Sequence, residues 1–202
     1  MGFFDMFRRG QPVVTRTELT DFIDAQAAFL AQKGMFEYSR ARAGVFGNIL
    51  FDDKGFLAEL ERARWIAFAV TLGMVAEAVE GELRPAAGEQ SAAVRAAVHA
   101  ATLEAFDRYP VPASLEPGIW ANLREALDRD LKLMGLHPVK RVMDIPARFV
   151  DRYLAAMPIH EKLRAKDDVA IHNFLKTNLC HAHEAFSKRA NISALIKVLT
   201  TA

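Results

Sequence analysis

The chain has 202 residues, 51% of them hydrophobic and 25% charged, which is the composition of an ordinary globular domain and excludes wholesale disorder. Lys plus Arg total 26 and Asp plus Glu total 25, so the net charge is +1. A domain that binds nucleic acid is clearly basic, and we therefore expect no nucleic-acid partner.

Cysteine content and hydropathy point to a compartment. Cys180 is the single cysteine, so an intrachain disulfide is excluded and a reducing compartment is expected. The first residues lack the apolar stretch and the cleavage site of a secretory signal. The longest apolar run, residues 65–76, is shorter than the about 20 residues that cross a bilayer. We expect a soluble, cytoplasmic protein; peripheral contact with the inner membrane remains open.

The N-terminal part predicts a tail followed by helix. Residues 1–14 are expected to form an apolar and basic tail, and residues 15–202 a single all-helical domain. The pattern Thr15-Arg16-Thr17-Glu18 is a capping box, which starts a helix. Gly34 is expected to stop that helix, and residues 35–43 to form another helical piece.

The middle of the chain predicts the core helix. Gly44, Gly47 and Asn48 mark a break. Residues 53–82 then predict one long helix that is apolar nearly all round, which is typical of a central helix; Arg84-Pro85 is expected to end it. A further, alanine-rich helix is expected over residues 91–109.

The second half predicts shorter helices after a proline-rich connection. Three prolines punctuate residues 110–117, a candidate hinge between two lobes. Helices are then expected over residues 119–134, from Asp144 to Pro158, from Asp167 or Asp168 to about residue 190, and over residues 192–199. No segment alternates as a β-strand does. The sequence thus predicts an all-α, single helical-bundle domain of seven to eight helices.

Motifs for catalysis are absent from the sequence. It contains neither a glycine-rich phosphate loop nor the G-x-S-x-G of serine hydrolases. Cys180 lies close in sequence to His181 and His183, but adjacency in sequence is not the geometry that activates a thiol. We therefore expect no enzyme, and assign no catalytic or cofactor-binding residue.

Candidate metal ligands do not form a pattern that closes a site. His172 and His183 face one side of a predicted helix but are three turns, about 16 Å, apart. At the rim of an apolar stripe, such histidines are typical packing residues. Glu77 and Glu80 could be paired carboxylates, but the E-x-x-H motif of helical di-metal proteins is absent. We predict no bound metal; a role for these residues or Cys180 beyond packing stays open.

An aromatic residue beside two arginines gives two readings. In Tyr38-Ser39-Arg40-Ala41-Arg42 the guanidinium groups could bind a phosphate or a carboxylate in bidentate fashion. The interpretation we favour is internal pairing, in which Arg40 and Arg42 contact an acidic side chain of the fold, one of Glu37, Glu59 or Glu61.

The tail carries the candidate binding residues. Four large apolar side chains are followed directly by two arginines: Phe3, Phe4, Met6, Phe7, Arg8 and Arg9. Such a segment could contact a partner or place its rings at the boundary of an anionic membrane, and it could equally dock on the domain's own core or on a second copy. Residues 132–197 carry twelve basic against six acidic side chains, which offers a second contact for a weak membrane attachment.

Three stretches of the second half carry a family resemblance. They are a leucine-rich helix end that closes at Gly135, the segment Val139-Lys140-Arg141-Val142-Met143 ahead of Phe149 and Tyr153, and Asp167-Asp168 leading to Phe174, Leu175 and Asn178. The N-terminal half adds Ala25-Gln26-Ala27 ahead of Phe36 and Tyr38. In the order of these features the chain resembles the ubiquinol–cytochrome c chaperone family.

The resemblance implies a function without catalysis. Members of that family are helical assembly factors for the respiratory ubiquinol–cytochrome c reductase. By that likeness, the chain is expected to hold an apolar or partly folded client segment in a groove between helices, at or near the inner membrane. Two alternatives remain open: a soluble helical scaffold or regulatory interaction module, and a helical enzyme that binds a small molecule or metal. Neither client nor oligomeric state follows from the sequence.

Overall fold

The computed structural model describes residues 10–158 and 161–201, with only the backbone described over 161–166. Within these ranges every regular element is helical, and a single isolated bridge joins Val13 to Ala190. The prediction of an all-α fold is confirmed. In chain order the helices are α1 (Arg16–Ala43), η2 (Gly44–Phe46), α2 (Gly47–Asp52), α3 (Lys54–Ala87), η3 (Gly88–Gln90), α4 (Ser91–Asp107), α5 (Pro117–Met134), η4 (Val142–Arg148), α6 (Val150–Ala156), α7 (Glu161–Arg189) and α8 (Ile192–Thr200).

Helix α1 begins where the capping box predicts. The Thr15 hydroxyl accepts from the backbone N–H of Glu18 at 3.2 Å, and a carboxylate oxygen of Glu18 accepts from the Thr15 N–H at 2.9 Å. The predicted stop at Gly34 is wrong, because α1 continues to Ala43. A β-carbon at Gly34 would overlap the hydroxyl of Tyr153 and crowd the ring of Phe174. Glycine is present here to let another helix approach, not to end α1.

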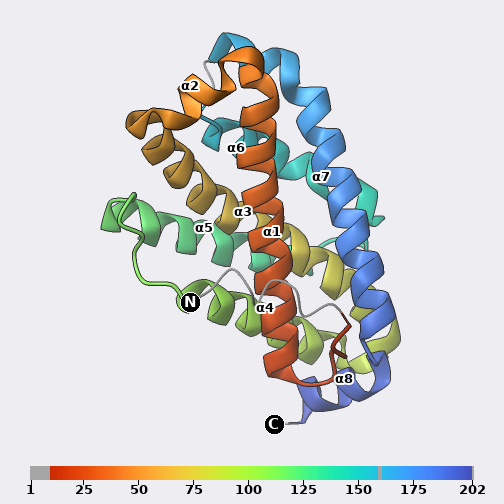
Figure 1. Cartoon of the computed structure of the whole chain (residues 1–202). Helices are drawn as coiled ribbons and strands as arrows, with labels where there is room; N and C mark the ends of the chain where they lie inside the picture. Colours follow the sequence, from red (N-terminus) through yellow and green to blue (C-terminus); the bar gives the residue numbers. More distant parts are fainter. Residues whose placement is uncertain (1–9, 159–160, 202) are drawn as a thin grey trace.

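Helix α3 is the centre of the bundle, as its apolar sequence predicts. Every residue from 67 to 80 is buried, and α1, α4, α5, α6 and α7 all pack against α3 (Figure 1). Asp53 caps the start of the helix, and its carboxylate accepts from the Phe56 N–H at 2.6 Å. It runs past Pro85 to Ala87, further than predicted, because its last turn is buried through Leu83 and Ala87 and is held by packing.

The connection over residues 110–117 joins helices that share one hydrophobic core. Buried side chains from before and after it belong to the same cluster. Trp120 on α5 stacks on Phe106 of α4 with ring centroids 4.1 Å apart, and it meets Trp65 of α3 at 5.8 Å. The described residues therefore form a single helical domain, and this connection does not separate two lobes.

Two predicted helix starts in the second half are wrong. Asp144 does not cap a helix: the chain forms η4 from Val142, and α6 begins only after Phe149. The Asp144 carboxylate instead accepts from Arg141 Nε at 2.7 Å. Asp167 lies inside α7, which begins at residue 161.

Candidate functional site

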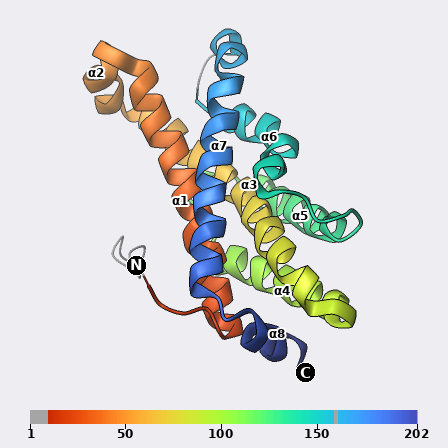
Figure 2. The same ribbon diagram turned by 90° about the vertical axis from the view of Figure 1, so that its right-hand side faces the viewer.

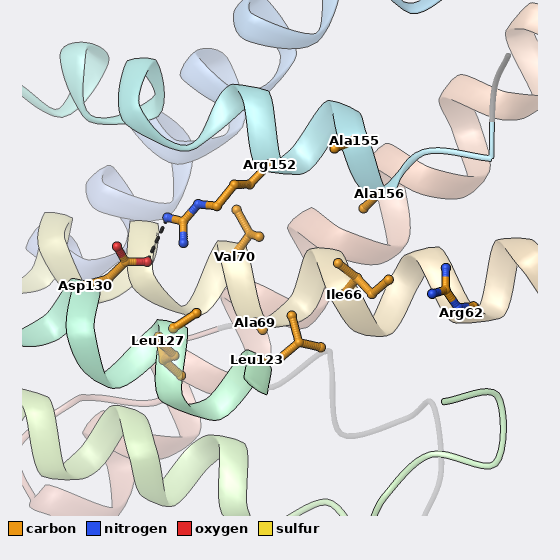
Figure 3. Close-up of a pocket in the computed structure, with 11 residues that line it drawn as sticks. Arg62, Ile66, Ala69, Val70, Leu123, Leu127, Asp130, Arg152, Ala155 and Ala156 are labelled. Carbon is orange, nitrogen blue, oxygen red and sulfur yellow. Dashed lines mark hydrogen bonds and ion pairs between the residues drawn. The ribbon is translucent and has the colours of Figure 1, made fainter. Parts of the chain in front are cut away.

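An open groove lies between α3, α5 and α6 (Figure 3). It offers about 360 Å³ of space. Its walls are apolar and combine four branched side chains with four alanines: Ile66, Ala69, Val70, Leu123, Ala126, Leu127, Ala155 and Ala156. Because alanine places a single methyl group between neighbouring helices, the alanines leave unfilled the space that larger side chains would occupy. The groove can therefore accept apolar side chains from outside.

The amphipathic character of α5 explains why one side of it faces the groove. Its buried residues, among them Trp120 and Leu127, pack toward α3, while charged side chains such as Arg124 and Arg129 face away. A helix with one apolar stripe docks on the core through that stripe. Leu123 lies at the edge of the stripe and is only half buried, so it forms part of the groove wall.

The two ends of the groove differ in charge pairing. At one end Arg152 donates to an Asp130 carboxylate oxygen at 2.7 Å, and the Arg152 guanidinium lies 5.2 Å from the ring centroid of Phe149. Arg62 lies toward the other end (Figure 3) and has no ion-pair partner in the part of the chain that the structure describes. An apolar ligand that carries a carboxylate would find a free cation there.

Glu77 is a buried carboxylate surrounded by cations. It is 4% exposed, and Lys140 donates to one of its oxygens at 3.0 Å. Arg148 lies 3.1 Å from the other oxygen, and the His137 ring nitrogen lies 3.7 Å away. All three basic residues belong to the segment between α5 and α6, so the ion pairs fasten that segment to α3.

Glu80 makes a second buried ion pair. Both of its carboxylate oxygens accept from Arg84, each at 2.6 Å, and Arg84 also donates to the backbone carbonyls of Met134 and His137. The sequence draws attention to Glu77 and Glu80 as paired carboxylates, yet each is used within the fold. Their cationic partners were missed, although the basic residues over 137–148 were an available signal for Glu77, and Arg84, four residues along the helix, for Glu80.

One histidine of α7, His183, contacts α3. His183 Nε2 lies 2.9 Å from a Glu82 carboxylate oxygen, and the Ser187 hydroxyl donates to the other oxygen at 3.2 Å. Serine and histidine thus both contact the carboxylate, whereas a catalytic triad needs the hydroxyl to donate to the imidazole. Among the described side chains no group of three or more His, Cys, Asp or Glu could hold a metal ion.

Arg42 pairs inside the fold, but its partner was not among those predicted. Its Nε lies 3.0 Å from an Asp167 carboxylate oxygen, which joins α1 to α7. The same region raises the pKa of the Tyr38 hydroxyl, through burial first and then through the neighbouring Asp167 carboxylate. Arg40 lies over the Phe51 ring at 5.8 Å. The partners expected from sequence, Glu37, Glu59 and Glu61, do not pair with either arginine in the described structure.

The predicted tail residues lie outside the described residues: Phe3, Phe4, Met6, Phe7, Arg8 and Arg9. The described surface has another apolar projection, which we call the α2 tip: Val45, Phe46 and Ile49. These side chains are 91%, 67% and 72% exposed. Figure 2 shows α2 at one end of the molecule, far from α4 and α8. In the sequence, these apolar residues lie beside Gly44 and Gly47. The sequence interpretation used only the glycines, as the mark of a break.

The basic excess over residues 132–197 is partly used by neighbouring acids. Lys132 donates to Asp128 at 2.5 Å, and Lys188 donates to Glu184 at 2.5 Å. Helices within the described ranges are all too short or too polar to cross a membrane. Comparison of the chain with protein-family models, with curated proteins and with solved structures finds no match. The fold and the groove define the class: an all-α domain with an open apolar groove.

Proposed function

We propose that this chain is a non-enzymatic binding protein that holds an apolar segment of a client protein in the groove between α3, α5 and α6. The observation that carries the proposal is the groove itself, about 360 Å³ of open space between apolar walls. Amphipathic helices bind other proteins by laying an apolar face into such a groove. A segment with two or three apolar side chains on one face fits this description.

The polar groups around the groove suit binding better than chemistry. Arg152 is already paired with Asp130, and the walls contain no hydroxyl, thiol or imidazole that could act as nucleophile or base. The buried carboxylates Glu77 and Glu80 are held by cations. Packed helices frame the surface, which favours a preformed groove over one that closes around a substrate.

The most specific form of the proposal is an assembly factor for a respiratory membrane complex. It rests on the resemblance of feature order to the ubiquinol–cytochrome c chaperone family. In that form the client is a subunit of the complex that has not yet been assembled, and the protein works at the cytoplasmic face of the inner membrane. Subunits of such complexes have long apolar segments that need cover before assembly.

Affinity purification from the native host tests both the binding of a client in the groove and the identity of that client as a respiratory subunit. The groove is blocked by Ala155→Trp, an exposed position of α6 that lines it. Ala96→Trp, at an exposed position of α4, is the matched control. We expect membrane respiratory subunits to copurify with the wild type and with the control but not with the blocked variant. Copurification of other proteins alone, lost on blocking, would replace the respiratory role with a scaffold role. If the same partners copurify with the Ala155→Trp variant, the groove is not the binding site.

A further inference from the structure

The apolar side chains of the α2 tip are exposed and are not part of the hydrophobic core. Helix α2 is held from one side by Phe51, whose ring centroid lies 6.5 Å from that of Phe36 and 5.4 Å from that of Phe56. No residue of α2 is buried, and Val45 and Ile49, one helical turn apart, are 91% and 72% exposed. A contiguous exposed apolar surface of this kind marks an interaction site.

We propose that the α2 tip of one copy docks in the groove between α3, α5 and α6 of a second copy. The tip is a protruding helical turn with exposed apolar side chains, and the groove is an open hollow with apolar walls, so the two surfaces match in apolar character. Docking removes both apolar surfaces from water, which is the driving force for association.

Charge complementarity supports a second copy as the occupant. Asp52 lies three residues after Ile49, so both lie on one side of α2, and its exposed carboxylate has no ion-pair partner among the described residues. Arg62, toward one end of the groove, also has none. Within one copy the two do not pair: Arg62 lies eight residues beyond the start of α3, about 12 Å along the helix axis. A tip from another copy can bring an aspartate to Arg62.

The proposal adds a form of regulation to the groove. When the tip of a second copy occupies it, other apolar segments are excluded, and the exposed tip is covered as well. The contact is one helical turn on a groove, so it belongs to the small and weak interfaces, with association expected at about 0.1 mM and above. A tighter-binding segment therefore displaces the second copy readily.

Sedimentation equilibrium of the full chain, from about 10 µM to about 1 mM, tests this contact. The wild-type mass should rise above that of one chain as the concentration increases. The double variant Phe46→Asp/Ile49→Asp should keep the mass of one chain. Asp52→Arg and Arg62→Glu should each do the same, because each brings like charges together, whereas the combination Asp52→Arg/Arg62→Glu should restore association.

Leu136→Asp, which changes an exposed leucine in the α5–η4 connection, and Lys197→Glu on α8 should associate as the wild type does. Circular dichroism checks that every variant is folded. A wild type that keeps the mass of one chain at about 1 mM overturns the proposal. So does association that survives the tip variant, or a charge exchange that fails to restore it.

Discussion

Substituting Gly34 by alanine tests the reasoning about how the helices pack. Gly34 lies in α1 where Tyr153 of α6 crosses it, and the Tyr153 hydroxyl donates to the Leu30 carbonyl of α1 at 3.0 Å. Tyr153 is fully buried, so its ring cannot move into solvent. A methyl group at residue 34 must push the hydroxyl off that carbonyl or spread the helices.

The magnitude follows from three contributions. Overpacking costs about 1–3 kcal/mol, and a buried hydroxyl that loses its partner costs about 1–3 kcal/mol. The higher helix propensity of alanine offsets about 1 kcal/mol. We expect Gly34→Ala to lower the free energy of unfolding by about 1–5 kcal/mol. Gly118→Ala on α5, where a β-carbon meets open space, should not destabilise the protein.

Urea denaturation followed by circular dichroism measures these changes. Tyr153→Phe removes the hydroxyl that the new methyl group would strike, so the double variant Gly34→Ala/Tyr153→Phe should be more stable than the sum of the two single changes predicts. The reasoning is refuted if Gly34→Ala is as stable as Gly118→Ala, or if the two changes at the crossing are additive.

Three further predictions concern charge and the tail. Glu77→Gln, which leaves the cations around a buried carboxylate unbalanced, should lower the free energy of unfolding by about 2–4 kcal/mol in urea denaturation, and an unchanged midpoint would contradict this. Hydrogen bonds from Lys132 and then His99 lower the pKa of Asp128. A group whose pKa is lowered in the folded state stabilises the fold at pH values above the ordinary aspartate pKa of about 3.9. This stabilisation is lost as pH falls through the pKa of the folded state. Asp128→Asn should therefore be less stable than the wild type at pH 7, by under about 1 kcal/mol, and the difference should shrink as pH falls below about 3.9; a constant difference would contradict the assignment. Flotation with anionic liposomes at low salt should be weaker for a chain lacking residues 1–10 than for the full chain, and equal flotation would remove the tail's role at membranes.

Local signals in the sequence predicted local features of the fold. The capping box at Thr15, the long central helix and the helix after Asn191 each depend on residues a few positions apart, and the structure confirms them. Gly34 could not be interpreted in this way. Its neighbour Tyr153 lies 119 positions away, so a glycine that allows a close crossing looked like a glycine that ends a helix.

The candidate site, like the role of Gly34, depends on contacts between segments that lie far apart in the sequence. The groove is lined by residues of three helices, and no periodicity shows that Ala69, Ala126 and Ala155 will face one another. The partner of Arg42 is Asp167, which the sequence alone predicted as a helix cap. Exposure of the α2 tip was also hidden, because an apolar run between glycines gives no sign of which side is left uncovered.

Site-specific photo-crosslinking in the native host tests the central claim most directly. A photoreactive phenylalanine analogue replaces Ala155, which lines the groove, or Ala96 on α4, which does not. If the groove holds a client segment, irradiation gives a discrete crosslinked product from residue 155 that is absent from residue 96, and peptide mapping places the attachment in an apolar segment of another protein. If residue 155 gives no product, or the same products as residue 96, the groove is not the binding site.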